Sequence, residues 1–480
     1  MSIEKMIDIL CEGKDSKMVE GFIKFLGEKL WKQYDDYLMD KVLIAENEFK
    51  AIPFNIPNAK ENQPYEQQVF LPEGCKAVIE SVTGLSIEDQ GLRIEVSENK
   101  KGFKIIGTPS LESFRKDGAA VQISTFDLIM RYHFEGLELP KSRLVLERTI
   151  PFIINQDPRK LWKNLSVDWD GKAEPKYQND DIQSEYVKVK ALEDGTAQKD
   201  IVAASKRGRS HAQEAKPRDD HFKLYHDEAT NWYVMAVADG AGSAKYSREG
   251  SRIACETVVS YCKEQLADCA KFEEEIDAYN LFKEDSESEA RKMVGDYIYK
   301  IVGTAAFKAQ KAIFDEAQKQ NIPSKQYATT LLLTISKKFP YGWFVASFWV
   351  GDGAICLYDK ENHTAKLLGV PDEGEYAGQT RFLTMPEIFK DATSLYQRLR
   401  FNIVPDFTAL LLMTDGVSDP MFETDANLIN PDKWDALWEN LKEGGVDLTD
   451  DNEASKDQLL DWLDFWSPGN HDDRTIAILY

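Results

Sequence analysis

The chain has 480 residues, of which 82 are acidic and 59 are basic, so its formal net charge is −23 at pH 7. This acidic balance argues against a nucleic-acid partner, because phosphate backbones are bound by dense basic surfaces. No apolar run approaches the roughly 18 residues of a membrane span, and the acidic N-terminus is unlike a secretory signal. The six cysteines contain no CxxC pair, which favours a reducing compartment. We therefore expect a cytoplasmic protein without membrane association, with two or three domains.

The first 155 residues predict a helix followed by a β domain. Residues 1–50 carry apolar side chains at spacings of three and four, which is typical of a helical segment. Over residues 66–155, short strand-like runs alternate with Gly, Pro and Asn turns, which predicts an all-β sandwich. Gly91–Ile94 (GLRI) and Gly102–Pro109 (GFKIIGTP) resemble a signature of bacterial immunoglobulin-like domains. That resemblance implies a spacer or a module that binds a protein partner.

The remaining chain predicts a second, larger domain. Residues 156–200 are polar and charged, and we expect a linker there. Residue 201 then begins an alternation of apolar strands and helices that runs to residue 480, with a loop-rich segment at 360–400. We expect strands at 201–204, 232–238, 328–336, 343–350, 354–358, 407–414 and 474–480, and helices at 249–270, 284–319 and 456–466. Paired helices between groups of strands with hairpin-length links favour a mainly antiparallel α+β layered domain.

Aspartates punctuate four of the predicted strands. Asp239, Asp352 and Asp415 each follow an apolar strand, and Asp472 precedes the last strand. One Asp-Gly pair after a strand is most often a plain turn, but four aspartates in one domain, each after or before an apolar strand, indicate a site. In an antiparallel sheet the start of one strand lies beside the end of its neighbour, so the four carboxylates can share one edge. Such a group repels itself unless cations lie between its members, and oxygen ligands suit Mg²⁺ or Mn²⁺. Two such ions can share a hydroxide and clamp a phosphoryl group for hydrolysis.

The order of these motifs resembles the metal-dependent protein phosphatase 2C family over residues 201–480. The motifs are ADGAGS at 238–243, ATTLLLTI at 328–335, WVGDGAICLY at 349–358, LLLMTDGVSD at 410–419 and DDRTIAIL at 472–479. The segment GEYAGQTRFLT at 374–384 also resembles a bacterial subgroup of the family. The resemblance implies an antiparallel β-sandwich flanked by helices, in α-β-β-α layers. It also implies hydrolysis of phosphoserine and phosphothreonine in proteins with two Mn²⁺ or Mg²⁺ ions and a third, looser ion.

The resemblance implies roles for individual residues. Asp239 would bridge both ions through its carboxylate, and Gly240 would offer its carbonyl to one of them. Asp415 and Asp472 would complete the binuclear centre. Asp220 would act through a water, so that Asp239 and Asp220 carry the chemistry of the hydroxide.

Two further pairs of residues follow from the resemblance. Asp352 and Asp419 would hold the third ion. The family's first motif places an arginine a few residues before an acidic pair to hold the phosphate. Here that spacing is longer, and Arg209 and His211 are the candidates for binding the substrate phosphate.

The sequence departs from the family at four positions near the proposed ligands. Ala241 stands where the family has histidine, and Ser243 stands where it has glycine. Asp473 stands where it has asparagine, and Arg474 where an apolar residue is usual. None of these changes removes a direct ligand.

We therefore predict a bacterial-type protein serine/threonine phosphatase whose N-terminal module positions it against a partner. Its partners would be a phosphorylated protein and the kinase that modifies that protein. Two alternatives stay open at this point. The first is a phosphoprotein-binding scaffold with weak catalysis, and the second is a phosphatase of small phosphorylated metabolites.

Overall fold

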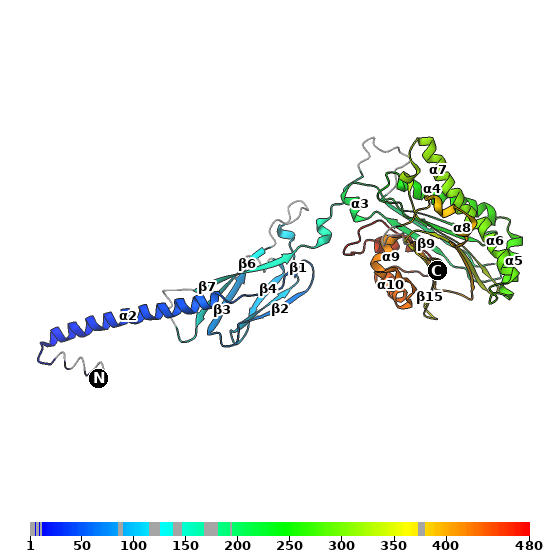
Figure 1. Ribbon diagram of the computed structural model, residues 1–480. Helices are drawn as coiled ribbons and strands as arrows, with labels where there is room; N and C mark the ends of the chain where they lie inside the picture. Colours follow the sequence, from blue (N-terminus) through cyan, green and yellow to red (C-terminus); the bar gives the residue numbers. More distant parts are fainter. Residues whose placement is uncertain are drawn as a thin grey trace. The chain divides into compact units, whose positions relative to one another are not determined.

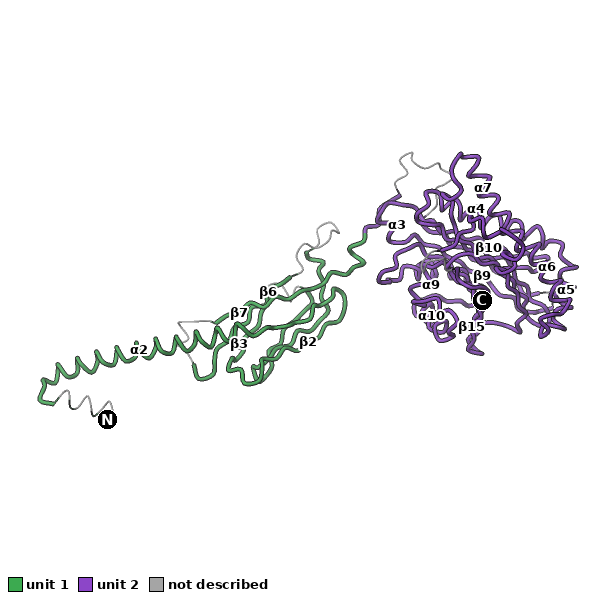
Figure 2. The backbone as a smooth tube through the Cα atoms, viewed as in Figure 1, with its two compact units in different colours: residues 1–162 green, residues 163–480 purple. Residues whose placement is uncertain are grey.

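The structure is a computed structural model of the whole chain, which divides into two compact units, residues 1–162 and 163–480 (Figure 2). It describes residues 5, 9, 12–84, 90–114, 125–137, 146–167, 181–192, 194–372 and 380–480. Most of the segment 374–384, used above for the bacterial subgroup, lies outside the described residues. Among the helices of the described ranges, none has both the length and the apolar character needed to span a bilayer.

Unit 1 begins with the helix α2 (Ser16–Lys50), which lies within the predicted helical segment. Asp15 caps it, because its carboxylate accepts hydrogen bonds from the backbone N–H groups of Lys17 and Met18. Near its C-terminal end, Val42 and Phe49 are buried in the core of the unit. The N-terminal half of α2 extends beyond the strands of unit 1 and does not pack against them (Figure 1).

The strands of unit 1 form two sheets that share one hydrophobic core. The four-stranded sheet has the order β1 (Ala59–Lys60), β7 (Leu146–Asn155), β6 (Thr125–Phe134) and β3 (Ala77–Gly84). The three-stranded sheet has the order β2 (Tyr65–Phe70), β5 (Gly102–Gly107) and β4 (Leu92–Val96). Alternate residues of β6 are buried, as expected for a strand with one face on a core. The immunoglobulin-like assignment of this region stays a prediction.

Unit 2 contains two larger sheets, and every strand pair in them is antiparallel. The first sheet has the order β10 (His221–His226), β11 (Tyr233–Ala238), β12 (Leu331–Phe339), β13 (Gly342–Val350) and β16 (Leu399–Val404). The second has the order β15 (Thr364–Leu367), β14 (Ala354–Asp359), β17 (Ala409–Met413), β18 (Arg474–Leu479), β9 (Ile201–Lys206) and β8 (Ile182–Val187).

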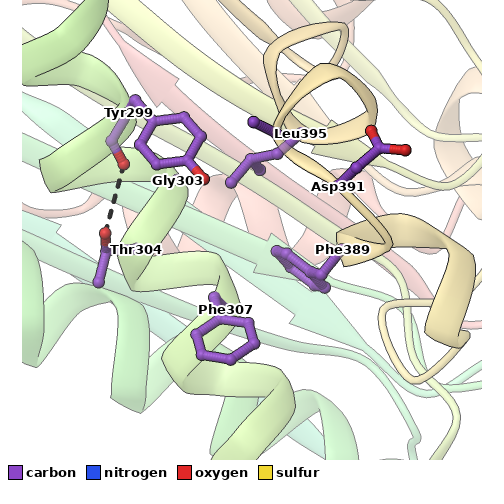
Figure 3. Close-up of a pocket in the computed structure, with 8 residues that line it drawn as sticks. Tyr299, Gly303, Thr304, Phe307, Phe389, Asp391 and Leu395 are labelled. Carbon is purple, nitrogen blue, oxygen red and sulfur yellow. Dashed lines mark hydrogen bonds between the residues drawn. The ribbon is translucent and has the colours of Figure 1, made fainter.

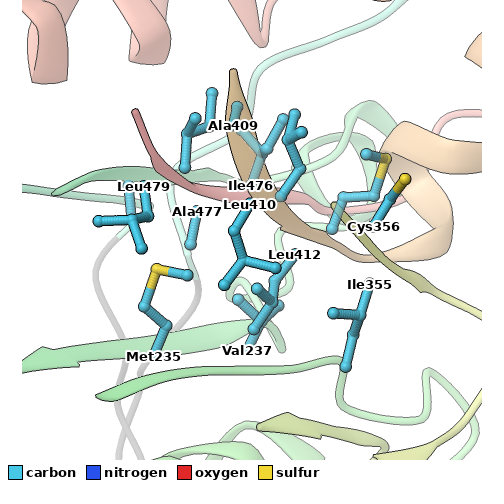
Figure 4. Packing of buried hydrophobic residues seen from close by; sticks show 14 of the residues in the cluster. Met235, Val237, Ile355, Cys356, Ala409, Leu410, Leu412, Ile476, Ala477 and Leu479 are labelled. Atoms are coloured by element: carbon cyan, nitrogen blue, oxygen red, sulfur yellow. The ribbon is translucent and has the colours of Figure 1, made fainter. Parts of the chain in front are cut away.

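Strand β11 is buried on both faces, which explains its unbroken apolar sequence. Met235 and Val237 point into the core between the two sheets, where Leu410, Leu412 and Ile476 of the second sheet lie (Figure 4). The intervening residues of β11 belong to a second core, which the helices close.

Helices cover the outer face of each sheet. The core of the first sheet is closed by α4 (Ser247–Leu266), α5 (Ala270–Leu281), α6 (Glu289–Ile298) and α7 (Thr304–Gln320). Side chains of α9 (Asp415–Phe422), α10 (Pro431–Glu443) and α11 (Ser455–Trp462) join the core of the second sheet. The prediction of a mixed α and β protein with an N-terminal helix is confirmed.

The expected linker at 156–200 contains a strand, which corrects that interpretation. β8 pairs along its whole length with β9. Its sequence, IQSEYV, is polar because β8 is an edge strand with no fully buried residue. Backbone pairing rather than side-chain burial holds such a strand in the sheet.

The single helix expected at 284–319 is two helices joined by a π-helical turn, η5 (Tyr299–Gly303). The Thr304 hydroxyl donates a hydrogen bond of 3.4 Å to the carbonyl of Tyr299 at this turn (Figure 3). The turn borders a pocket of 270 Å³ whose other walls include Phe307, Phe389 and Leu395, the last from the short helix α8 (Ala392–Tyr396). This pocket shares no lining residue with the aspartate motifs.

Candidate metal centre

Asp239 lies directly after β11, and two threonines fix its backbone. Its N–H donates to the Thr330 hydroxyl at 2.8 Å, and the N–H of Thr330 donates to the Asp239 carbonyl at 2.8 Å. The Thr329 hydroxyl donates to the same carbonyl at 2.8 Å. Because all three bonds join the end of β11 to the start of β12, the Asp239 carboxylate is held at a fixed place on the sheet edge.

Gly240 follows in a place where no larger residue fits. A Cβ atom there would lie 2.7 Å from the carbonyl oxygen of Asp219 and 2.9 Å from the Cβ atom of Ser247. The missing side chain therefore lets the chain before β10 and the first turn of α4 close over the loop.

Three of the predicted ligands come together. Asp239, Asp352 and Asp415 each offer a carboxylate oxygen, and these oxygens all lie within 4.8 Å of one another. Asp415 opens α9, and Asp352 lies in the turn between β13 and β14. The Thr380 hydroxyl donates to Asp352 Oδ2, whereas Asp352 Oδ1 is buried without a hydrogen-bond partner among the described residues. Asp419 lies one turn further along α9 and is exposed.

Asp220 occupies the floor of the site. It is completely buried, and its Oδ2 accepts hydrogen bonds from the Thr475 hydroxyl at 2.6 Å and the Thr414 hydroxyl at 3.0 Å. Its charge contributes to the raised pKa of Asp239. Thr414 directly precedes Asp415, and Thr475 lies two residues after Asp473. Asp220 therefore bonds the motifs that carry Asp415 and Asp473.

The electrostatics of the cluster are unfavourable for bare carboxylates. Burial, followed by repulsion from Asp415, raises the pKa of Asp239 well above its ordinary value. Burial and then Asp352 do the same to the pKa of Asp415, and they raise the pKa of Asp419 to about 6. Burial and Asp473 raise the pKa of Asp220 to about 7. A divalent cation would relieve this repulsion, and an all-oxygen ligand set suits Mn²⁺ or Mg²⁺.

Asp472 belongs to a second group, with His211 and Asp473. The imidazole of His211 is buried, with its Nδ1 3.0 Å from Asp473 Oδ2 and its Nε2 3.8 Å from Asp219 Oδ2. Burial lowers the pKa of His211, but the attraction of Asp473 outweighs this and raises the pKa to about 9. Asp472 still interacts with the first group, because its charge contributes to the raised pKa of both Asp239 and Asp415.

Asp473 links the segments of the chain that meet in the second group. Its carboxylate accepts hydrogen bonds from the backbone N–H of Gly208 at 2.6 Å and of Asp219 at 2.5 Å, besides its contact with His211. Burial alone would raise the pKa of Asp473, but His211 and these N–H donors lower it below its ordinary value. Asp473 therefore carries a charge that pairs with the imidazolium of His211.

Arg209 lies outside both groups of carboxylates. Its guanidinium donates to the carbonyl of Asp464 at 3.0 Å, to Asp464 Oδ1 at 3.2 Å and to the carbonyl of Phe465 at 3.2 Å. It also covers the ring of Trp466, with 5.4 Å between the guanidinium carbon and the ring centre. The structure thus brings His211 to the acidic residues but engages Arg209 with the turn after α11.

The sequence analysis did not single out the residues that fix the predicted ligands in place. Thr330, Thr414 and Thr475 bond either Asp239 or Asp220, and Asp473 joins Gly208 to Asp219. The sequence did contain a signal for these threonines. Thr414 and Thr475 stand within two residues of an aspartate, and the ATT segment at 328–330 leads into β12, the strand paired with β11.

Two antiparallel sheets thus end in a cluster of half-buried and buried carboxylates, a ligand set that suits divalent metal ions. The sequence model of the protein phosphatase 2C family matches residues 207–464, which is more than half of the chain. The chain belongs to this family. Membership of this family makes it a protein phosphatase. Asp472 lies beyond the matched range, and the structure groups it with His211 and Asp473.

Solved structures of similar proteins include bacterial phosphatases. The catalytic domain of the serine/threonine protein phosphatase PstP, in complex with two manganese ions, is 14% identical; the match covers 62% of this chain and 98% of PstP, with a TM-score of 0.34. RsbX in complex with magnesium is 14% identical over 62% of this chain and all of its own, with a TM-score of 0.33. Stp1 from Staphylococcus aureus is 12% identical over 61% and 98%, with a TM-score of 0.35. No curated protein matches the chain.

Proposed function

We propose that Asp239, Asp415 and Asp472, with the carbonyl of Gly240, hold the two metal ions of this phosphatase. The observation that carries the proposal is the trio Asp239, Asp352 and Asp415, whose carboxylate oxygens lie within 4.8 Å of one another. Asp352 Oδ1 is buried there without a hydrogen-bond partner among the described residues, as suits an oxygen that binds a cation. Asp352 and Asp419 would hold the third ion.

The protein's own residues then have separate tasks. Two bound divalent ions supply Lewis-acid activation of water and neutralise charge on the phosphoryl oxygens. Asp239 fixes the position of the centre, because β11 and the two threonines leave its backbone no freedom. Asp220 would orient a water bound to a metal ion, because Thr414 and Thr475 fix its Oδ2 and thereby the direction of its carboxylate.

His211 and Arg209 stay predicted candidates for binding the substrate phosphate, but their contacts in the structure favour a different role. His211 is buried between Asp473 and Asp219, and Arg209 is bonded to the turn at Asp464. These contacts favour a positioning role for both residues, in which they hold the loop that carries the acidic pair before β10.

We also propose a substrate, protein partners and a cellular location for this enzyme. A phosphorylated protein is the substrate of such an enzyme, and we propose a kinase that opposes it and a partner protein for the immunoglobulin-like module of unit 1. A cytoplasmic location is supported by the acidic composition and by cysteines that are all free within the described residues.

The test is phosphate release from a phosphoserine peptide with Mn²⁺. Asp239→Asn should lower kcat by at least about a hundredfold, because it weakens a ligand of both ions. The control is Asp406→Asn, which changes an exposed aspartate whose partner is Lys199. Equal rates for wild type and Asp239→Asn would refute the assignment of the ligands.

The same preparation separates the two alternatives stated above. A scaffold would bind the phosphopeptide without releasing phosphate. A phosphatase of small metabolites would hydrolyse small phosphate esters with a far higher kcat/KM than the phosphopeptide.

A further inference from the structure

Helix α2 carries an unusual share of the exposed apolar surface. The described residues include 22 exposed large hydrophobic side chains, and 11 of them lie on this one helix. They include Phe25 at 51%, Leu30 at 47% and Trp31 at 68% exposure. Isolated apolar residues on a surface are ordinary, but a dense apolar surface on a protruding helix marks a contact with another molecule.

Part of this surface lies along one side of the helix, interrupted at Lys41, and we call it the α2 stripe. Its residues recur at spacings of three and four, with one gap of seven, and they are Val19, Ile23, Leu26, Leu30, Tyr34, Tyr37 and Ile44. At 3.6 residues per turn these positions fall on one side of the helix over about 38 Å. Such a spacing is that of a helix that packs along a second helix.

The α2 stripe is not the face that packs on the strands of unit 1. That role belongs to Leu38, Val42, Ala45 and Phe49, and the ring of Phe49 lies 4.6 Å from the ring of Tyr132 on β6. The helical period places these residues about a quarter of a turn around the axis from the stripe. Five stripe residues accordingly keep exposures between 45% and 59%, namely Ile23, Leu30, Tyr34, Tyr37 and Ile44.

The charges along α2 indicate what covers the stripe. Residues 16–33 contain four lysines and two glutamates, whereas residues 34–50 contain five acidic residues and two lysines. The N-terminal half is therefore basic and the C-terminal half acidic. Two copies of the helix that run in opposite directions place each basic half beside the other's acidic half, whereas parallel copies place like charges together.

We propose that the α2 stripe pairs antiparallel with the α2 stripe of a second copy of this chain. With Leu30 opposite Tyr34 at the centre, Lys29 comes beside Asp36 of the other copy, because both residues lie on the same flank of the stripe, about a quarter of a turn from its midline. Covering the stripes would bury on the order of 1,200 Å² in the pair, which reaches the size of a specific interface. A membrane surface fits less well, because helices that lie on membranes carry a basic polar face and α2 has a net charge of −1.

The experiment is sedimentation equilibrium of the full chain over a wide range of concentration. The wild type should have twice the mass of one chain at micromolar concentration. Leu30→Glu places a charge in the centre of the stripe and should raise the dimer Kd at least about a hundredfold. Phe25→Glu is the matched control, because it adds the same charge at an exposed apolar residue of the same helix, away from the stripe, and should leave the Kd unchanged.

A charge exchange tests the antiparallel register. Lys29→Glu should weaken the dimer about tenfold, and the double variant Lys29→Glu, Asp36→Lys should restore it. Far-ultraviolet circular dichroism and Mn²⁺-dependent phosphatase activity check the folding of each variant. The proposal is overturned if the wild type is monomeric up to about 100 µM, if Phe25→Glu disrupts the dimer as Leu30→Glu does, or if the double variant stays as weak as Lys29→Glu. Co-sedimentation of the wild type, but not Leu30→Glu, with phosphatidylserine vesicles would assign the stripe to a membrane and also overturn it.

Discussion

Replacing Asp220 by asparagine is expected to stabilise the metal-free protein and to remove most of the stabilisation that Mn²⁺ provides. Burial and the repulsion of Asp473 raise the pKa of the Asp220 carboxyl to about 7, against 3.8 in an unfolded chain. Keeping this group ionised in the folded protein therefore costs free energy. At about 1.36 kcal/mol for each pKa unit the full difference is roughly 4 kcal/mol, and relaxation around the site makes roughly 2–4 kcal/mol the expected value.

The sign of the pH dependence follows from the higher pKa of the folded state. The contribution of Asp220 to stability is fully present below about pH 3.8 and is lost as the pH rises through about 7. Without metal, the wild type should therefore lose stability between these values more steeply than Asp220→Asn. The carboxamide oxygen can still accept the hydroxyl groups of Thr414 and Thr475, so the packing is preserved.

The assay is chemical unfolding in EDTA at pH 5 and pH 8, repeated with Mn²⁺. A ligand at a hundred times its Kd adds about 2.7 kcal/mol to the free energy of unfolding, and the wild type should show a gain of this order. Asp220→Asn should be more stable than wild type in EDTA at pH 8, with little further gain from Mn²⁺. Asp406→Asn is the control for removing one negative charge. The reasoning fails if Asp220→Asn is no more stable than wild type in EDTA at pH 8.

Three other substitutions test the supports of the site. His211→Ala leaves the buried Asp473 without its counter-charge and should destabilise the protein by about 3–5 kcal/mol. Adding Asp473→Asn to His211→Ala should recover part of that loss. If the unfolding free energies of the two substitutions simply add, the pairing is contradicted. Thr330→Val removes the hydroxyl that accepts the Asp239 N–H and should cost about 1–3 kcal/mol together with a loss of kcat, with Thr334→Val on the same strand as the control. Gly240→Ala should cost about 1–3 kcal/mol, because its Cβ would press on the Asp219 carbonyl; an unchanged melting temperature would show that the loop can yield.

The sequence predicted the inner strands of unit 2 and missed all four edge strands of its sheets. Inner strands such as β11 and β13 are buried throughout, so their apolar runs are unmistakable. The edge strands β8, β10, β15 and β16 mix polar and apolar residues, because each pairs with one neighbour only and has residues that are not fully buried. Their place depends on backbone bonds to strands that are distant in sequence, which local patterns do not encode.

The sequence indicated the clustered aspartates of the candidate site better than the residues that support them. An aspartate that ends a buried strand has a recognisable context, and Asp239, Asp352 and Asp415 meet as the strand contexts predicted. The roles of His211 and Asp473 depend on a contact between residues that are 262 positions apart. The break of the long helix at Tyr299–Gly303 was also hidden, because a π-helical turn adds a residue without a proline to mark it.

The complete burial of β11 has a consequence for how the enzyme loses its metals. Amide hydrogens of a strand that is covered on both faces exchange with solvent only when the whole unit opens, whereas exposed loops exchange through local fluctuations. The N–H of Asp239 is further protected by its bond to Thr330. Chelation of the ions should therefore leave the exchange of the β11 amides slow, so that the same backbone can take up Mn²⁺ again without refolding. Asp239 would then keep its position when the metals are removed. The more exposed aspartates, Asp419 and Asp472, would return to their places around it when metal binds again.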